Sequence, residues 1–214
     1  MPSCCDPNGL SDRFGAETAE ADARSYLRRG LDSDERRVIA FLKERGIAGA
    51  TVLEIGGGVG AMQLDLLQAG AARAHNVEIS PHYEKSAGAL AAQSGVTDRV
   101  ERVVADFVAV SAAIPAADAV IMHKVVCCYP DMPDLVRPAA EHSRRWLLLT
   151  FPGDRWWIRA GMRAANRVQT LVGSRYRVFF HEPREIRAVA ERAGLRPVLD
   201  QRGVFWQFLA LERA

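Results

Sequence analysis

The segment 51-TVLEIGGGVG-60 decides the fold of this chain. Its first five residues, 51–55, have the length and apolar character of a short buried strand, and a helical pattern follows over residues 61–68. Glycines at positions 56, 58 and 60 let the backbone turn tightly between the two elements and approach a ligand closely. The segment therefore predicts a strand–turn–helix unit with a ligand site at its turn.

The same alternation of short apolar runs and helical patterns continues along the chain. We expect further strands over 73–78, 100–105, 117–122 and 145–151, with helices over 81–93 and 133–142 between them. This alternation predicts a mostly parallel sheet with helices on both faces. After a helix over 183–194, the runs 196–201 and 204–211 are too close for a parallel crossover, so they must form an antiparallel hairpin. The fold class is therefore a doubly wound α/β domain with an antiparallel last strand.

Other segments flank or interrupt this pattern. Residues 1–15 have no periodicity, and helices are expected over 18–29 and 33–46. We therefore divide the chain into an N-terminal helical arm or lid, 1–46, and an α/β domain, 47–214, with a basic helical insertion at about 153–181.

Composition narrows the class of protein. The chain has 214 residues and a net charge of +2, which argues against a nucleic-acid partner. No apolar run reaches the roughly 20 residues that a membrane span needs. The first residues lack the pattern of an export signal, so we expect a cytoplasmic protein whose four cysteines are reduced. The oligomeric state cannot be predicted from these features.

Acidic residues lie where three neighbouring strands end. Glu54 interrupts an apolar strand, where an unpaired carboxylate is costly, so it should bind the turn amides or a cationic ligand. Glu78 ends the second strand about 20 residues after the first glycine, the position of a ribose-binding acid. Asp106, followed by Phe107, ends the third strand, where it could accept from an adenine amino group or simply cap a helix.

Taken together, LEIGGGVG (53–60), VEIS (77–80), ADF (105–107) and the final hairpin resemble the successive motifs of class I S-adenosylmethionine (SAM)-dependent methyltransferases. The resemblance implies a Rossmann-like seven-stranded sheet of order 3-2-1-4-5-7-6 with strand 7 antiparallel. It also implies a SAM site. Its methionine part would be bound by Glu54, Gly56, Gly58 and Gly60, its ribose by Glu78 and Ile79, and its adenine by Asp106 and Phe107. A nicotinamide-dependent oxidoreductase and a SAM-binding protein without turnover are the alternatives, and the hairpin counts against the former.

The segment 122-MHKVVCCYPD-131 follows the fourth strand, which in this family borders the transferable methyl group. His123 and Tyr129 are candidate bases or orienting groups, although a backbone-bonded histidine beside the cofactor is the simpler reading of His123. Cys128 is a candidate polar contact. The pairs Cys4–Cys5 and Cys127–Cys128 could meet around a soft metal, but the C-x-x-C spacing of zinc sites is absent, so we expect no metal and buried thiols.

The segment 155–181 has six arginines and no acidic residue, and Arg155, Arg159, Arg163 and Arg167 recur at helical spacing. Three interpretations of these arginines remain. The arginines form a solvated face, or they belong to a substrate lid with Trp156, Arg159 and Arg163, or the helix contacts an anionic membrane surface.

Four stretches are similar to the magnesium-protoporphyrin O-methyltransferase branch: 15–30, 127–130, 181–195 and 205–214. The chain departs from that branch at Phe14, Lys124 and Cys128, where the branch has tyrosine, aspartate and histidine. We therefore carry over the architecture and not the substrate. The expected function is methyl transfer from SAM to a small or medium organic acceptor at oxygen, with sulfur as the main alternative.

Overall fold

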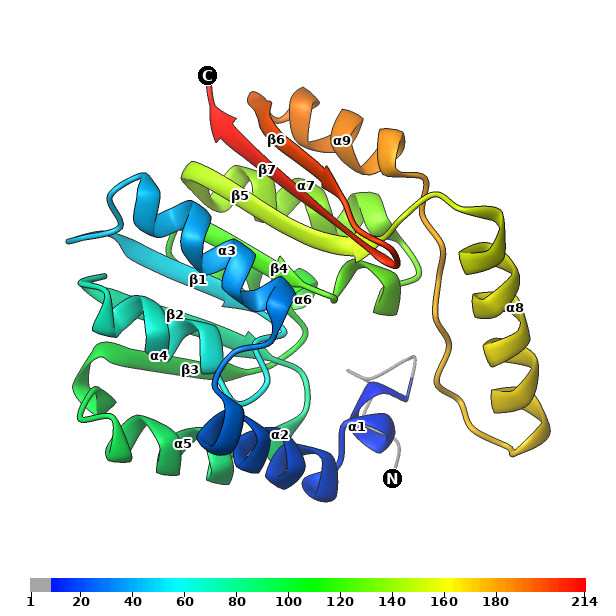
Figure 1. Ribbon diagram of the computed structural model, residues 1–214, viewed down its shortest axis with the longest axis horizontal. Helices are drawn as coiled ribbons and strands as arrows, with labels where there is room; N and C mark the ends of the chain where they lie inside the picture. The colour runs from blue at the N-terminus through cyan, green and yellow to red at the C-terminus, as the bar shows by residue number, and fades with distance from the viewer. Residues whose placement is uncertain (1–8) are drawn as a thin grey trace.

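A seven-stranded sheet of order β3-β2-β1-β4-β5-β7-β6 forms the centre of the computed structural model, which describes residues 9–214 (Figure 1). The first five strands are parallel, and β7 pairs antiparallel with both β5 and β6. The predicted strand order and antiparallel strand are therefore confirmed. The strands are β1 (Thr51–Ile55), β2 (Arg73–Glu78), β3 (Val100–Val104), β4 (Ala117–His123), β5 (Ser143–Pro152), β6 (Leu195–Arg202) and β7 (Trp206–Arg213).

Helices cover both faces of this sheet, and each face has its own apolar core. Along β4, Ala119 and Ile121 pack into one core, whereas Val120 and Met122 pack into the other. This alternation follows from the two-residue period of a strand. One core includes residues of α3 (Ser33–Glu44), α4 (Ala61–Gln68) and α5 (Glu84–Gln93), and the other includes residues of α6 (Phe107–Val110), α7 (Met132–His142) and α9 (Pro183–Arg192).

The described part of the N-terminal arm contains one more helix than the sequence predicts. Residues 10–13 form the short helix α1 (Leu10–Arg13), and α2 (Ala16–Arg29) begins two residues before the expected start. A single helical turn is too short to produce a periodic pattern, so the sequence does not predict α1. The predicted pair Cys4–Cys5 lies outside the described residues.

Hydrogen bonds join the part of this arm around α1 and α2 to the α/β domain. The Ser80 hydroxyl donates to the carbonyl of Phe14 at 2.7 Å. The hydroxyl of Tyr83, in the 3-10 helix η1 (Pro81–Tyr83), donates to Asp22 at 3.0 Å. The hydroxyl of Tyr26 donates to Asp65 at 2.8 Å. Because these bonds connect α1 and α2 to the carboxyl end of β2 and to α4, they fix the arm across the ligand-binding edge of the sheet (Figure 1).

The predicted basic insertion forms α8 (Trp156–Leu171), which stands apart from the sheet beyond the end of β5 (Figure 1). Ile158 and Met162 anchor the helix by packing with Cys127. The returning segment 174–181 runs back along it, where Asn166 exchanges two hydrogen bonds with the backbone of Val178 at 2.8 and 2.9 Å. Within residues 9–214, no helix has the length and apolar character needed to cross a membrane.

Candidate functional site

The turn between β1 and α4 has the backbone shape that its glycines predict. Gly56 and Gly58 have positive φ angles of 66° and 54°. A Cβ atom on Gly56 would lie 2.7 Å from Cγ2 of Val125, and one on Gly58 would lie 3.2 Å from the Tyr83 ring. Both positions therefore require glycine for their conformation and for the close approach of a neighbour.

Gly60, which precedes the first residue of α4, also has a positive φ angle, 78°, but the atoms nearest to a Cβ there belong to the movable side chain of Gln63. A Cβ atom on Gly57 would overlap the Asn76 side chain and lie 2.7 Å from Cδ of Glu54. No feature of the sequence distinguishes Gly57, because its φ angle is ordinary and only packing against two distant side chains restricts it.

A cavity of about 390 Å³ opens beside this turn, where β1 lies between β2 and β4. This is the point at which the strand order reverses, the usual ligand site of open α/β sheets. The cavity is within the size range of small-molecule sites. Seven of the predicted site residues line it: Glu54, Gly56, Gly58, Glu78, Ile79, His123 and Cys128. The other predicted site residues do not line it: Gly60, Asp106, Phe107, Tyr129, Trp156, Arg159 and Arg163.

Glu54 is the most unusual group in the cavity wall. Its side chain is 2% exposed, and its Oε2 atom has no hydrogen-bond partner. The backbone amide of Gln63 donates to the carboxylate, so the turn amides themselves do not satisfy it. Burial, together with the negative charge of Glu35, raises the pKa of Glu54 to about 8. A cationic ligand in the cavity would compensate this buried carboxylate.

Glu78 shapes the turn from the neighbouring strand. Its two carboxylate oxygens accept hydrogen bonds from the backbone amides of Gly58 and Ser80, both at 2.9 Å. Burial raises the pKa of Glu78, whereas the bonds from Ser80 and Gly58 lower it. Because each carboxylate oxygen has two lone pairs, Glu78 can still accept from a ligand hydroxyl while it holds the turn.

Asp106 is placed as a helix cap, the simpler of the two roles that the sequence allowed. It accepts from the backbone amide of Val108 at 3.0 Å at the start of α6. Its other oxygen accepts from the Tyr129 hydroxyl at 3.3 Å, and burial raises the pKa of Tyr129 to about 12. Tyr129 thus contacts Asp106, and neither residue lines the cavity. Phe107 does not line it either, because its side chain is buried in the apolar core.

His123 ends β4 inside the cavity. Neither of its ring nitrogens has a hydrogen-bond partner, and both are fully buried. The expectation of a backbone-bonded histidine is therefore wrong, because the strand ends where the ring faces the cavity and no carbonyl is in reach. Burial, reinforced by the Lys124 ammonium, lowers the pKa of His123 to about 3, so the ring is neutral near pH 7.

Lys124 follows with a φ angle of 61°, the one positive φ of a non-glycine residue in the described part of the chain. Its ammonium lies 2.8 Å from Oδ2 of Asp32 and 3.7 Å from Asp34. The turn after β4 is thereby tied to the N-terminus of α3. A non-glycine residue in this conformation costs of order 1 kcal/mol or more, a strain that is common at functional sites.

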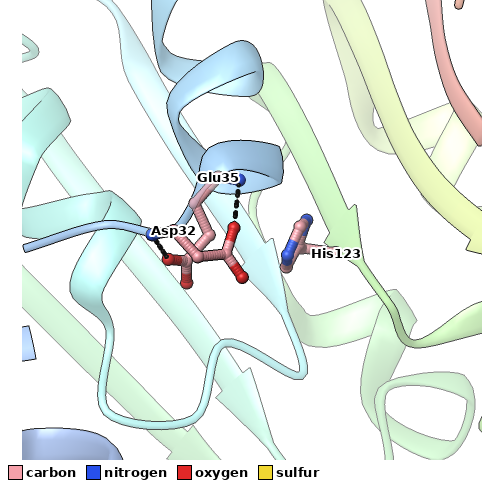
Figure 2. Close-up of side chains that lie close together, drawn as sticks. All are labelled: Asp32, Glu35 and His123. Atoms are coloured by element: carbon pink, nitrogen blue, oxygen red, sulfur yellow. Dashed lines mark hydrogen bonds between the residues drawn. The ribbon is translucent and has the colours of Figure 1, made fainter. Parts of the chain in front are cut away.

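The start of α3 contributes two carboxylates to the cavity wall, although the sequence predicts only a helix terminus there. Asp32 is the N-cap of α3, and it forms a capping box with Glu35. Figure 2 shows these two carboxylates beside the His123 ring. The D-x-x-E pattern at 32–35 predicts a capping box, but it carries no sign that both side chains also line a cavity.

Cys127 and Cys128 form a pair in the 3-10 helix η4 (Val126–Cys128). Cys127 is buried, as expected, whereas Cys128 is half-buried and lines the cavity. The Cys128 thiol lies 3.4 Å from the hydroxyl of Tyr176, in the segment that returns from α8. The hydrogen bond between the two thiols lowers the pKa of Cys128 and raises that of Cys127.

The three predicted lid residues of α8 lie away from the cavity. The Trp156 side chain is 80% exposed. Arg159 forms ion pairs with Asp154 and, at 2.7 Å, with Glu182. Arg159 therefore fastens α8 to the domain in this conformation, and Arg163 is likewise outside the cavity wall.

Comparisons with known proteins agree with this architecture. The family model described as a methyltransferase domain matches residues 24–200. No curated protein matches the sequence. Among solved structures, a magnesium protoporphyrin IX methyltransferase from Synechocystis PCC 6803 with bound S-adenosylhomocysteine (SAH) superimposes with a TM-score of 0.76 at 19% identity, covering 98% of this chain and 100% of that one. An O-methyltransferase family protein from Burkholderia thailandensis superimposes with a TM-score of 0.73 at 17% identity, covering 97% and 63%.

The family match spans most of the chain and includes the glycine turn and the strands whose ends form the cavity. The structural likenesses, at identities below 20%, support the fold. The oxidoreductase alternative is not supported, since the matching family is one of methyltransferases. The chain belongs to the methyltransferase domain family, and its seven-stranded sheet has the strand order of the class I methyltransferase fold.

Proposed function

We propose that the cavity binds SAM and that the enzyme transfers its methyl group to an oxygen of a small or medium organic acceptor. The observation that carries this proposal is the buried, unpartnered Oε2 of Glu54 in the cavity wall. SAM carries a sulfonium and an ammonium, and a cation is the ligand that compensates a buried carboxylate. Gly56 and Gly58 would let the methionine part lie against the backbone of the turn.

The nucleoside end of SAM is assigned to the ends of β2 and β3. We propose that Glu78 accepts from the ribose hydroxyls while Ile79 packs against the sugar or base, since both line the cavity. Asp106 and Phe107 are proposed for the adenine. Because the Tyr129 hydroxyl occupies one oxygen of Asp106, the adenine amino group would have to replace it or use the other oxygen.

The acceptor end is assigned to His123 and Cys128. Methyl transfer is an in-line displacement, in which the acceptor oxygen bonds to the methyl carbon as the carbon–sulfur bond breaks and the sulfonium becomes a thioether. The proton of the acceptor hydroxyl is released to solvent water. The neutral ring of His123, with two unpartnered nitrogens, can accept a hydrogen bond from the acceptor hydroxyl and orient it. A pKa of about 3 makes the ring a poor proton carrier, so orientation is the proposed role rather than general base catalysis.

The charge of the cavity supports a neutral acceptor. Five acidic residues line it, namely Asp22, Asp32, Glu35, Glu54 and Glu78, whereas Lys124 is the basic residue among the lining residues in the described part of the chain. An acceptor carboxylate would be repelled here, and the arginines of α8 lie outside the cavity wall. We therefore propose a hydroxyl group as the methyl acceptor, with a thiol as the alternative.

Turnover assays test the acceptor. SAH release would be measured with matched panels of phenols, alcohols, carboxylic acids, thiols and amines. The proposal predicts turnover with a hydroxyl compound and a loss of at least about tenfold in kcat/KM with His123→Phe. Turnover confined to thiols or amines would contradict the assignment of oxygen, and binding of SAM without turnover of any acceptor class would favour a binding protein.

A further inference from the structure

Three potential metal ligands converge at the acceptor end of the cavity. Asp32, Glu35 and His123 each place one ligand atom within 4.8 Å of those of the other two (Figure 2). A first-row divalent cation binds nitrogen and oxygen ligands at about 2.0–2.2 Å, so two ligands of one ion are at most about 4.4 Å apart. A movement of order 1 Å would bring all three atoms into range of one ion.

The capping box fixes both carboxylates and leaves each with one oxygen for a ligand. Oδ1 of Asp32 accepts from the backbone amides of Asp34 and Glu35, both at 2.8 Å. Oε2 of Glu35 accepts from the backbone amide of Asp32 at 2.6 Å. The second oxygen of each carboxylate is outside the capping box, so the helix terminus holds the two groups in a defined arrangement without using all of their acceptors.

His123 is the independent sign of a ligand at this cluster. Its two ring nitrogens are fully buried, and neither has a hydrogen-bond partner. A buried polar atom without a partner costs free energy, so an arrangement of this kind requires a compensating contact.

Lys124 competes for this position. Its ammonium binds Oδ2 of Asp32 at 2.8 Å, the oxygen that the capping box leaves over. A cation of higher charge would displace the ammonium, whose side chain is 28% exposed and can turn toward solvent. The Lys124 ammonium therefore competes with a bound cation for Asp32, and replacing Lys124 should strengthen cation binding.

We propose that Asp32, Glu35 and His123 form a binding site for a first-row divalent cation at the acceptor end of the cavity, with Lys124 as its competitor. One imidazole and two carboxylates are ligands that suit manganese, iron and zinc. The ion would leave coordination positions open toward the cavity, where an acceptor oxygen could complete them. The site adds a function to the proposed methyl transfer and does not depend on it.

Mn²⁺ is the probe, because sulfur ligands such as Cys127 and Cys128 bind it poorly. The purified full chain, without SAM, would be titrated with Mn²⁺ and free ion followed by electron paramagnetic resonance. The proposal predicts one Mn²⁺ per chain, a loss of about tenfold or more in affinity with His123→Phe and with Glu35→Gln, and a gain of about tenfold with Lys124→Met. Gln at position 35 keeps an acceptor for the capping box.

Asp34→Asn is the matched control. It removes a carboxylate from the same helical turn and also lies near Lys124, but Asp34 is not one of the three ligands. Its Mn²⁺ affinity should stay within about threefold of that of the wild type. The proposal fails if neither the wild type nor Lys124→Met binds Mn²⁺ at millimolar concentration, or if folded His123→Phe binds it as well as the wild type does. Because SAM is absent from the titration, either of these failures would leave the proposal of a SAM site valid.

Discussion

The substitution Glu54→Gln should weaken SAM binding and remove most of its dependence on pH. With a pKa of about 8, Glu54 is protonated in about nine-tenths of the ligand-free molecules at pH 7. A cationic ligand favours the ionised form, so binding at pH 7 releases close to one proton. The SAM affinity of the wild type should therefore rise by up to about tenfold per pH unit from pH 6 to 8 and level off above pH 8.

Glutamine has nearly the same shape but carries no charge. A hydrogen bond to a charged group contributes about 1.5–3 kcal/mol, so Glu54→Gln should lose roughly tenfold to 150-fold in SAM affinity at pH 8. The assay is isothermal titration calorimetry from pH 6 to 9, in two buffers of different ionisation enthalpy to count released protons. SAM has its own titrating amine, and the difference between wild type and variant cancels that contribution.

The same substitution should stabilise the ligand-free protein at higher pH. The pKa of Glu54 is about 8 in the folded state and 4.5 in the unfolded chain, a difference worth about 5 kcal/mol at most. The unfolded chain loses this proton first as the pH rises, so the stability of the wild type falls between pH 4.5 and 8 and then stays level. Urea denaturation of Glu54→Gln should lack this fall.

Glu101→Gln is the matched control, because it removes the same charge from a side chain on β3 that is 66% exposed. It should change neither SAM affinity nor the pH dependence of stability beyond about 0.5 kcal/mol. Unchanged SAM affinity of Glu54→Gln across this pH range would refute the reasoning that the buried carboxylate serves a cationic ligand.

Three further predictions concern other parts of the site. Gly57→Ala should abolish measurable SAM binding, because the new methyl group would displace Glu54. The control Gly88→Ala lies on α5 with no atom within 4 Å of its new methyl group, so it should leave binding intact and stabilise the fold by about 0.5–1 kcal/mol. Equal SAM affinities of the two variants in calorimetry would contradict this. The free energy of unfolding should fall less between pH 6.5 and 4.5 in His123→Phe than in the wild type. In this range His123 takes up a proton in the unfolded chain but not in the folded protein, where its pKa is about 3. Urea denaturation at the two pH values measures the difference. If α8 covers the acceptor during turnover, Trp156→Ala should raise the acceptor KM several-fold at an unchanged SAM affinity, and an unchanged KM would remove Trp156 from the lid.

Local patterns predicted most of the fold. The strand at 51–55 and the helix at 61–68 match the observed bounds of β1 and α4, because an apolar run, a glycine turn and a helical period follow one another directly. The antiparallel final pair was predictable because two runs separated by two residues leave no room for a crossover. The order of the strands came from the resemblance to a family, since no local pattern fixes it.

The site was predictable where function depends on the end of a strand. Glu54, Glu78 and His123 line the cavity because β1, β2 and β4 end at the same edge of the sheet. Contacts between distant segments could not be predicted. The pairing of Tyr129 with Asp106, which lies 23 residues earlier, keeps both out of the cavity wall, and no feature of the sequence indicates it.

The N-terminal arm shows the same limit. Asp22 meets Tyr83 across 61 residues, and Asp32 meets Lys124 across 92. In the sequence these acids look like ordinary charged residues of helices and helix termini. Their place in the cavity wall follows only from the way the chain from α1 to the start of α3 crosses the edge of the sheet.

The central claim is that the cavity between the glycine turn and the N-terminal arm holds SAM. Calorimetric titration of the wild-type chain at pH 8 with SAH, and separately with NAD⁺, tests it most directly. We predict binding of one SAH per chain at micromolar concentration and no heat with NAD⁺. Folded protein that binds NAD⁺, or that shows no heat with either SAM or SAH, would contradict the assignment of this cavity.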